Sequence, residues 1–161
     1  MSTARYQSIF APDLFRGQTI VVTGGGSGIG RCTAHELAAL GAHVVLVGRK
    51  EGKLQTVAAE IAQDGGSASW QACDIRDEAG VQAMVKQVVA EYGAIAALVN
   101  NAGGQYITPL AQISAKGWEA VLNTNLSGGF LVARECFVHS MQQHGGAIVN
   151  IVADIWGSMP G

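Results

Sequence analysis

The chain of 161 residues has a formal net charge of −2 at pH 7 and a pI near 6.0. Hydrophobic residues make up 48% of it and charged residues 14%, a composition that indicates a folded domain with a sizeable core and excludes a disordered chain. The weak net charge gives no electrostatic reason to bind nucleic acid. The sequence shows neither an apolar run long enough to span a membrane nor a signal-peptide pattern. We therefore expect a cytoplasmic protein without nucleic-acid or membrane partners.

We expect a lead-in arm over residues 1–19 and one dinucleotide-binding domain over residues 20–161. The domain begins with an apolar, β-branched run at residues 20–22. This pattern is typical of a strand that is buried on both faces.

Five of the seven residues from 24 to 30 are glycine, and a helical pattern follows until the glycine stop at Gly41. In this helix Ile29, Thr33 and Leu37 are spaced to line one face. The order is therefore strand, glycine turn and helix.

A glycine turn between a strand and a helix is suited to binding a pyrophosphate. Residues without a Cβ allow positive φ and let an anion approach the main chain. The unpaired N–H groups of the first helical turn then face the anion, helped by the helix dipole. A flexible loop is the alternative interpretation, but the flanking strand and helix favour a dinucleotide site. The residues predicted to bind the cofactor here are Thr23, Gly24, Gly26, Ser27, Gly28, Ile29 and Gly30.

A second buried strand is predicted at residues 43–47, and it is followed by Gly48, Arg49 and Lys50. In dinucleotide-binding folds an acidic residue at this place binds the ribose 2′-OH of NAD, whereas an arginine accommodates the 2′-phosphate of NADP. The chain has two cations and no acid there, which favours NADP(H) over NAD(H), with Arg49 and Lys50 as ligands. A solvated basic turn is the alternative.

Apolar periodicity predicts the remaining helices at residues 54–61, 81–92 and 114–145, and the remaining strands at residues 67–73, 95–99 and 147–152, the last as a fifth buried strand. Gly128 and Gly129 interrupt the longest helix at a cost of roughly 1 kcal/mol each, and such small residues allow another helix to approach closely. The alternation of strands and helices predicts an α/β fold, a Rossmann-like doubly wound parallel sheet with helices on both faces.

No metal site is predicted. Cys32, Cys73 and Cys136 are far apart and form no C-x-x-C pair, so they are interpreted as reduced thiols. His139 and His144 are five residues apart and do not share a helix face as an i, i+4 metal pair would.

Three motifs make the chain resemble the short-chain dehydrogenase/reductase family. They are T-G-x-x-x-G-x-G from Thr23 to Gly30, N-N-A-G ending at Gly103, and N-T-N-L around Asn125. The resemblance implies an NAD(P)-dependent oxidoreductase that assembles as a dimer or tetramer, in part through the long helix.

The resemblance also implies roles for single residues: adenine contacts for Asp74 and Ile75, cofactor contacts for Asn101, Ala102 and Gly103, and support of the catalytic proton relay through water for Asn125. For Asp74 an ordinary N-terminal cap of the next helix is an equal alternative.

Two features of the family pattern are absent. Val152 and Ala153 stand where a serine that polarises the substrate carbonyl is expected, and Ser158 lies five residues later. The Y-x-x-x-K pair, whose tyrosine is the family's proton donor, would follow beyond the chain end. We therefore expect that the last strands, the tyrosine and the lysine are missing from this chain, that the chain alone is inactive, and that its fifth strand is left as an apolar edge.

Within the family the likeness is greatest to peroxisomal-type trans-2-enoyl-CoA reductases, through the lead-in at residues 6–18 and through residues 101–105, 113–125 and 145–151. This implies NADPH-dependent reduction of a C=C bond conjugated to an acyl thioester, in fatty-acid metabolism. A missing serine hydroxyl suits that reaction, because negative charge develops on the thioester oxygen. The alternatives are a carbonyl (3-oxoacyl or alcohol) reductase of the same family and a catalytically silent nucleotide-binding fragment.

Overall fold

The computed structural model of the chain describes residues 8–152. Within them lies a five-stranded sheet in which all neighbouring strands run parallel, in the order β3-β2-β1-β4-β5. The strands are β1 (Thr19–Thr23), β2 (His43–Gly48), β3 (Ser67–Ala72), β4 (Ile95–Asn100) and β5 (Ala147–Asn150). The chain builds outward from β1 to β3 and then returns to the other side of β1, so the predicted doubly wound α/β fold is confirmed.

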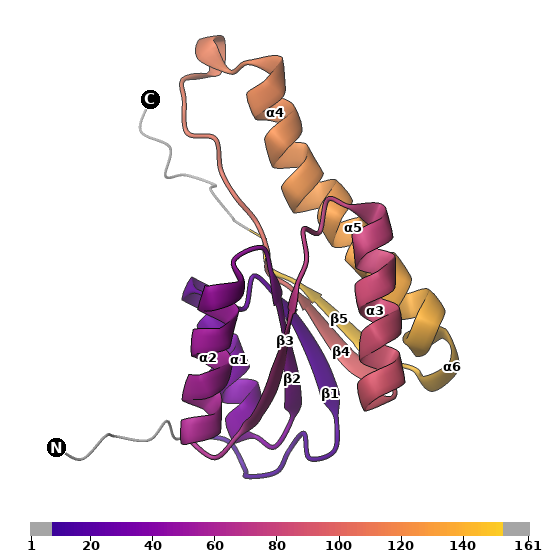
Figure 1. Cartoon of the computed structure of the whole chain (residues 1–161). Helices are drawn as coiled ribbons and strands as arrows, with labels where there is room; N and C mark the ends of the chain where they lie inside the picture. The colour runs from indigo at the N-terminus through magenta and orange to yellow at the C-terminus, as the bar shows by residue number, and fades with distance from the viewer. Residues whose placement is uncertain (1–7, 153–161) are drawn as a thin grey trace, which may run out of the picture.

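Helices cover both faces of this sheet (Figure 1). α1 and α2 lie on one face, and α3 and α5 lie on the other. The helices are α1 (Gly28–Ala39), α2 (Glu51–Gln63), α3 (Glu78–Tyr92), α4 (Ala115–Leu122), α5 (Gly129–Cys136) and α6 (Gln142–His144), with a 3₁₀ turn η1 (Leu110–Gln112) and π-helical turns η2 (Asn123–Gly128) and η3 (Phe137–Met141). No helix within residues 8–152 is long and apolar enough to cross a membrane.

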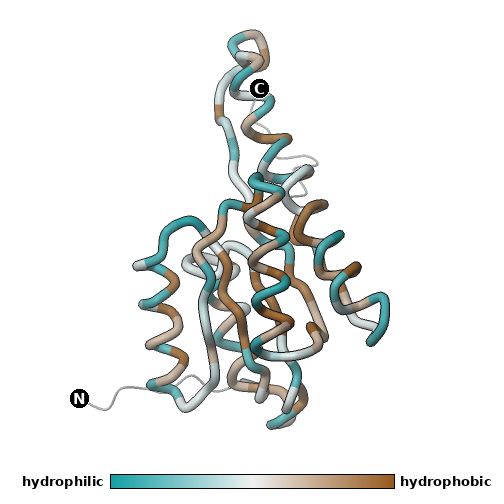
Figure 2. The backbone as a smooth tube through the Cα atoms, turned by 45° about the vertical axis from the view of Figure 1, so that its right-hand side comes forward, coloured by the Kyte–Doolittle hydropathy of each residue, from teal (hydrophilic) through white to brown (hydrophobic). Residues whose placement is uncertain are grey.

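The core consists of two clusters, one on each face of the sheet. Val21 and Val45 belong to the cluster beneath α3 and α5, whereas Ile20 and Val44 belong to the cluster beneath α1 and α2. Successive side chains of a strand point to opposite faces, so a sheet covered on both sides needs unbroken apolar strands. Figure 2 shows these hydrophobic strands between helices that alternate in hydropathy.

The buried face of α1 differs from the predicted one. Gly30, Ala34 and Ala38 are buried, while Ile29 is 62% exposed. A Cβ on Gly30 would collide with the glycine turn and lie 2.5 Å from Asn101 Nδ2, so α1 approaches the sheet through a residue without a side chain. Of the three residues predicted to share one face, Thr33 and Leu37 are half-buried, whereas Ile29 lies outside the buried face.

The fifth strand is exposed rather than buried. Ile148 and Val149 are 40% and 50% exposed. Among the described residues β5 pairs with β4 alone, so its second edge is uncovered. The burial predicted from the apolar run is wrong here, and the apolar edge expected for the chain as given is observed.

The long helical stretch is divided by the π-helical turns η2 and η3. At Gly128 an added Cβ would lie 2.8 Å from Ile75 Cδ1, so the missing side chain does permit a close approach. Within the described residues the approaching group is a side chain of the β3–α3 connection, and the approach of another helix stays a prediction.

Candidate functional site

The candidate site lies at the carboxyl ends of the strands, next to the point where the strand order reverses between β1 and β4. Ligands of open α/β sheets bind in this position. A cavity of about 340 Å³ is lined there by the glycine turn, the end of β2, the β3–α3 connection and the residues after β4. The predicted cofactor residues that line it are Gly24, Gly26, Ser27, Arg49, Lys50, Asp74, Ile75, Asn101, Ala102 and Gly103.

Thr23, Gly28, Ile29 and Gly30 were predicted in the same group, but they do not line this cavity. Residues that line it without having been predicted are Gly48, Lys53, Leu54, Cys73, Arg76 and Thr124. Of these, Lys53 has a signal in the sequence, since it stands four residues after Arg49 in the first turn of a helix.

The glycine turn has the backbone geometry that an anion site requires. The N–H of Gly24 donates to the carbonyl of Val47 at 2.8 Å, and Gly24 and Gly28 have φ of +68° and +54°. Space over Gly28 is open, with no atom within 4 Å of where a Cβ would stand. The side chain of the N-cap, Ser27, makes no capping hydrogen bond, which leaves N–H groups of the first turn of α1 for a ligand.

Thr23 and Asn101 brace this turn from below. The Thr23 hydroxyl oxygen accepts from the N–H groups of Asn101 and Ala102, both at 3.0 Å, and Asn101 Nδ2 donates to the Thr23 carbonyl at 3.0 Å. These bonds join the ends of β1 and β4. Thr23 is buried, and its hydrogen bonds hold the main chain beneath the cavity in place.

The other wall of the cavity is basic. Arg49, Lys50, Lys53 and Arg76 all line it. Within residues 8–152 no ion pair involves Arg49, Lys50 or Lys53, whereas Arg76 pairs with Asp74. Three cations therefore face the cavity without a carboxylate of the described chain bound to them.

Asp74 is held as a carboxylate by Arg76. Arg76 Nε lies 2.9 Å from Oδ1 and 3.1 Å from Oδ2, and the Arg76 backbone N–H donates to Oδ1 at 3.1 Å. The Arg76 hydrogen bond lowers the pKa of Asp74 to about 2, against an opposing effect of burial. The N-cap of α3 is Asp77, so the alternative that Asp74 caps this helix is wrong.

Asn125 lies in the π-helical turn η2 and binds the loop after β4. Its Oδ1 accepts from the Gly104 N–H and its Nδ2 donates to the Gly104 carbonyl, both at 2.8 Å. A Cβ on Gly103 would lie 2.8 Å from Oδ1, so the glycine at that position allows this contact. The amide thus ties the helix to the rim of the cavity.

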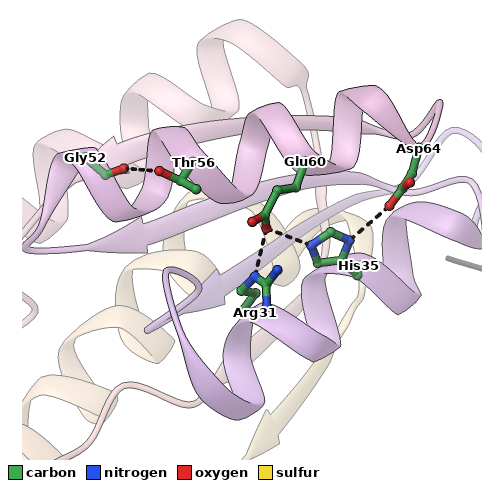
Figure 3. A network of polar contacts seen from close by, with 6 residues as sticks. All are labelled: Arg31, His35, Gly52, Thr56, Glu60 and Asp64. Atoms are coloured by element: carbon green, nitrogen blue, oxygen red, sulfur yellow. Dashed lines mark hydrogen bonds and ion pairs between the residues drawn. The ribbon is translucent and has the colours of Figure 1, made fainter. Parts of the chain in front are cut away.

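Behind the site a polar network connects α1 and α2 (Figure 3). Arg31 Nε donates to Glu60 Oε2 at 2.8 Å, and the two ring nitrogens of His35 lie 3.3 Å from Glu60 Oε2 and 3.6 Å from Asp64 Oδ2. The Arg31 hydrogen bond lowers the pKa of Glu60. The network links α1, whose N-cap Ser27 lines the cavity, to α2, whose first turn contributes Lys53 to the cavity wall.

A second cavity, of about 380 Å³, lies at the far ends of α1 and α2 and is lined by Phe10, Leu40 and Ile61 among others. The turn at Gly65 and Gly66 also lines it, but this turn joins the end of α2 to the start of β3, away from the carboxyl ends of the strands where ligands of such sheets bind. Cys73 and Cys136 are free and buried, and burial raises the pKa of both thiols, that of Cys136 to about 12. Residues 8–152 contain no group of three His, Cys, Asp or Glu that could hold a metal ion. Ala153 and Ser158 lie outside the described residues.

Known proteins resemble the chain along nearly all of its length. The family model described as "short chain dehydrogenase" matches residues 18–160. A probable 2,4-dienoyl-CoA reductase of Bacillus subtilis is 33% identical over 89% of this chain and 58% of its own. A peroxisomal 2,4-dienoyl-CoA reductase of Pongo abelii is 34% identical over 93% of this chain and 52% of its own.

A solved structure of a citronellol catabolism dehydrogenase from Pseudomonas aeruginosa PAO1 is 67% identical, with a TM-score of 0.91 over 97% of this chain and 64% of that one. The chain spans about half the length of the curated relatives it matches.

Proposed function

Because the chain belongs to the short chain dehydrogenase family, we propose that the protein is an oxidoreductase that transfers hydride between NADP(H) and a small organic substrate. The observation that carries the proposal is the cavity that joins the glycine turn to the basic wall around Arg49. The turn offers main-chain N–H groups to a pyrophosphate, and the open space over Gly28 leaves room for it.

The described residues fit NADP(H) better than NAD(H). Arg49 directly follows β2, where a carboxylate would be needed to bind a ribose 2′-OH. The carboxylate of Asp74, which also lines the cavity, is already bound by Arg76. A 2′-phosphate would instead meet unpaired cations.

In this proposal the bound cofactor supplies or accepts the hydride, and the chain positions it. Asp74 and Ile75 contact the adenine, the segment from Asn101 to Gly103 contacts the cofactor through its main chain, and Asn125 supports a proton relay through water. The two bonds from Asn125 to Gly104 are consistent with a positioning role, since they fix the loop after β4 next to Gly103, which lines the cavity. The tyrosine and lysine of the family motif are expected from the part of the protein outside this sequence.

For the substrate we propose a trans-2-enoyl-CoA thioester, reduced at its C=C bond. The likeness to two 2,4-dienoyl-CoA reductases supports a conjugated acyl thioester. The absence of a hydroxyl at Val152 and Ala153 supports it further, because carbonyl reduction in this family uses a serine there.

A second candidate is the oxidation of an alcohol, favoured by the 67% identity to a dehydrogenase named for citronellol catabolism. A 3-oxoacyl reductase or a catalytically silent nucleotide-binding protein would be the remaining outcomes.

One panel of assays on the full-length protein separates these candidates. NADPH consumption is measured with a trans-2-enoyl-CoA and with the 3-oxoacyl-CoA of equal chain length, and NADP+ reduction is measured with citronellol. We expect the enoyl thioester to be turned over fastest. Faster turnover of citronellol or of the 3-oxoacyl thioester would assign the protein to that branch. No turnover in any arm, with NADPH or NADH for the two thioesters and with NADP+ or NAD+ for citronellol, would contradict the enzymatic proposal.

We also propose a cytoplasmic homo-oligomer, a dimer or tetramer. The support is a row of exposed apolar side chains along the long helical stretch, where Trp118, Leu126, Phe130 and Phe137 are each at least half exposed. Sedimentation of the full-length protein tests the assembly, and a monomer at micromolar concentration would contradict it.

A further inference from the structure

The amino ends of β2 and β3 bring a histidine and two serines together, at the edge of the sheet opposite the cofactor cavity. His43, the first residue of β2, pairs with Ser67, the first residue of β3, and Ser69 follows on the same face of that strand. None of the three lines the cavity. Among the described residues β3 pairs with β2 alone, so Ser67 lies on an outer strand, where it is exposed.

Both ring nitrogens of His43 have a serine partner. Nδ1 lies 2.7 Å from Ser67 Oγ, and Nε2 lies 3.0 Å from Ser69 Oγ. The imidazole also stacks on the ring of Tyr92 in the last turn of α3, with 4.2 Å between the ring centroids and 29° between the planes. These three contacts fix the position and the orientation of the imidazole.

The hydrogen bonds of Tyr92 determine which ring nitrogen of His43 carries the proton. A carboxylate can only accept, so the Tyr92 hydroxyl donates to Glu91 Oε1, 2.6 Å away. The Tyr92 oxygen then accepts from the Ser69 hydroxyl. Because the proton of Ser69 is directed to Tyr92, the serine accepts from His43, and Nε2 is the protonated nitrogen. Nδ1 is therefore the acceptor nitrogen, and the Ser67 hydroxyl donates to it.

This chain of hydrogen bonds places a general base beside a nucleophile. Burial lowers the pKa of His43, against the opposing effect of the Glu91 carboxylate, so the ring is mainly neutral at pH 7. Burial and the hydrogen bond to Glu91 raise the pKa of Tyr92, which keeps the proton on its hydroxyl. A neutral imidazole that accepts from a serine hydroxyl and is oriented by a third group is the arrangement that activates serine for attack on acyl groups.

We propose that Ser67 is an activated nucleophile that accepts the acyl group of esters or thioesters with a good leaving group. Ser67 Oγ attacks the carbonyl carbon while its proton passes to His43 Nδ1. The bond from that carbon to the leaving oxygen or sulfur then breaks, and the proton passes from His43 to the leaving group. The product is an acyl ester of Ser67, and no oxidation or reduction is involved.

The test treats the full-length protein with p-nitrophenyl acetate at pH 7. Release of p-nitrophenolate gives the total rate, and mass spectrometry of peptides gives the rate of acetylation at each serine. General-base assistance is worth about 10²–10⁴-fold, so we expect Ser67 to react at least about 100-fold faster than Ser127, an exposed serine of η2.

Three variants separate the parts of the hydrogen-bond chain. His43→Gln removes the base and should slow acetylation of Ser67 by about 100-fold. Tyr92→Phe keeps a stacked ring but leaves Ser69 free to donate to Nε2, so acetylation should slow by about fivefold, the effect of one neutral hydrogen bond. The control Ser127→Ala should leave the rate at Ser67 unchanged. Circular dichroism and urea unfolding show whether each variant is folded, and Tyr92→Phe is the deciding variant if His43→Gln does not fold.

Any of three results would overturn the assignment of Ser67. The first is acetylation of Ser67 no faster than that of Ser127. The second is an unchanged rate at Ser67 in folded His43→Gln or in Tyr92→Phe, since the histidine would then not act as the base. The third is undiminished release of p-nitrophenolate in Ser67→Ala, which would show that another group of the protein attacks the ester.

Discussion

Gly30 is the position where one added methyl group should do the most damage to the cofactor turn. In Gly30→Ala the new Cβ would overlap the carbonyl oxygen of Gly24 and lie 2.5 Å from Asn101 Nδ2. Relieving such overpacking costs about 1–3 kcal/mol. Moving Asn101 also weakens its bond to the Thr23 carbonyl, at about 1 kcal/mol. Replacing glycine by alanine inside a helix returns about 1 kcal/mol.

The net expectation for Gly30→Ala is a loss of about 1–3 kcal/mol in the free energy of unfolding. For a domain of about 150–250 residues this lowers the Tm by roughly 2–12 °C. Urea unfolding of the full-length protein measures it, and NADPH affinity should fall in parallel. The matched control is Gly52→Ala in α2, where no atom lies within 4 Å of the new Cβ and stability should stay or rise. If Gly30→Ala unfolds at the same urea concentration as the unaltered protein, the packing argument is refuted.

Three further changes probe the same site. Thr23→Val removes the acceptor of two backbone N–H groups and should lower the free energy of unfolding, measured in urea, by about 1–3 kcal/mol. The control Thr56→Val loses only one exposed hydrogen bond and should lower it less, so equal losses in the two variants would contradict the bracing role of Thr23. Arg49→Gln should weaken NADPH binding about ten- to a hundredfold in a fluorescence titration and leave NADH almost unaffected; a parallel loss for both would argue against a 2′-phosphate contact. The pKa of Asp74 is about 2, below the unfolded value of about 3.9, so the ionised carboxylate stabilises the fold above pH 4 and this stabilisation is lost as the pH falls toward 2. Asp74→Asn should therefore lower the free energy of unfolding at pH 7 but not at pH 2. An equal difference at both pH values would contradict the ionised pair.

The sequence predicted those parts of the site that depend on the main chain and on element order. Glycines 24 and 28 adopt positive φ because a turn between β1 and α1 needs it, and that requirement can be inferred from spacing alone. Arg49 could be placed because it directly follows an apolar strand, and the carboxyl ends of parallel strands share one edge of the sheet.

Contacts between distant segments could not be predicted in this way. The hydrogen bonds between Thr23 and Asn101 join residues that are 78 positions apart in the sequence, and only the pairing of β1 with β4 brings these residues together. Ile29 has the spacing of a core residue but is exposed, because the tight approach at Gly30 rotates the small residues toward the sheet. The pairing of Asp74 with Arg76 likewise depends on side-chain orientation, and it removes one cation from those left to bind a ligand.

The central claim is that the cavity between the glycine turn and Arg49 binds NADP(H). It is tested most directly by calorimetric titration of the full-length protein with NADPH and with NADH under identical ionic strength. The account predicts that NADPH binds with a Kd at least about tenfold lower, as expected for one charge-assisted phosphate contact. Equal affinity for the two cofactors, or tighter binding of NADH, would contradict it.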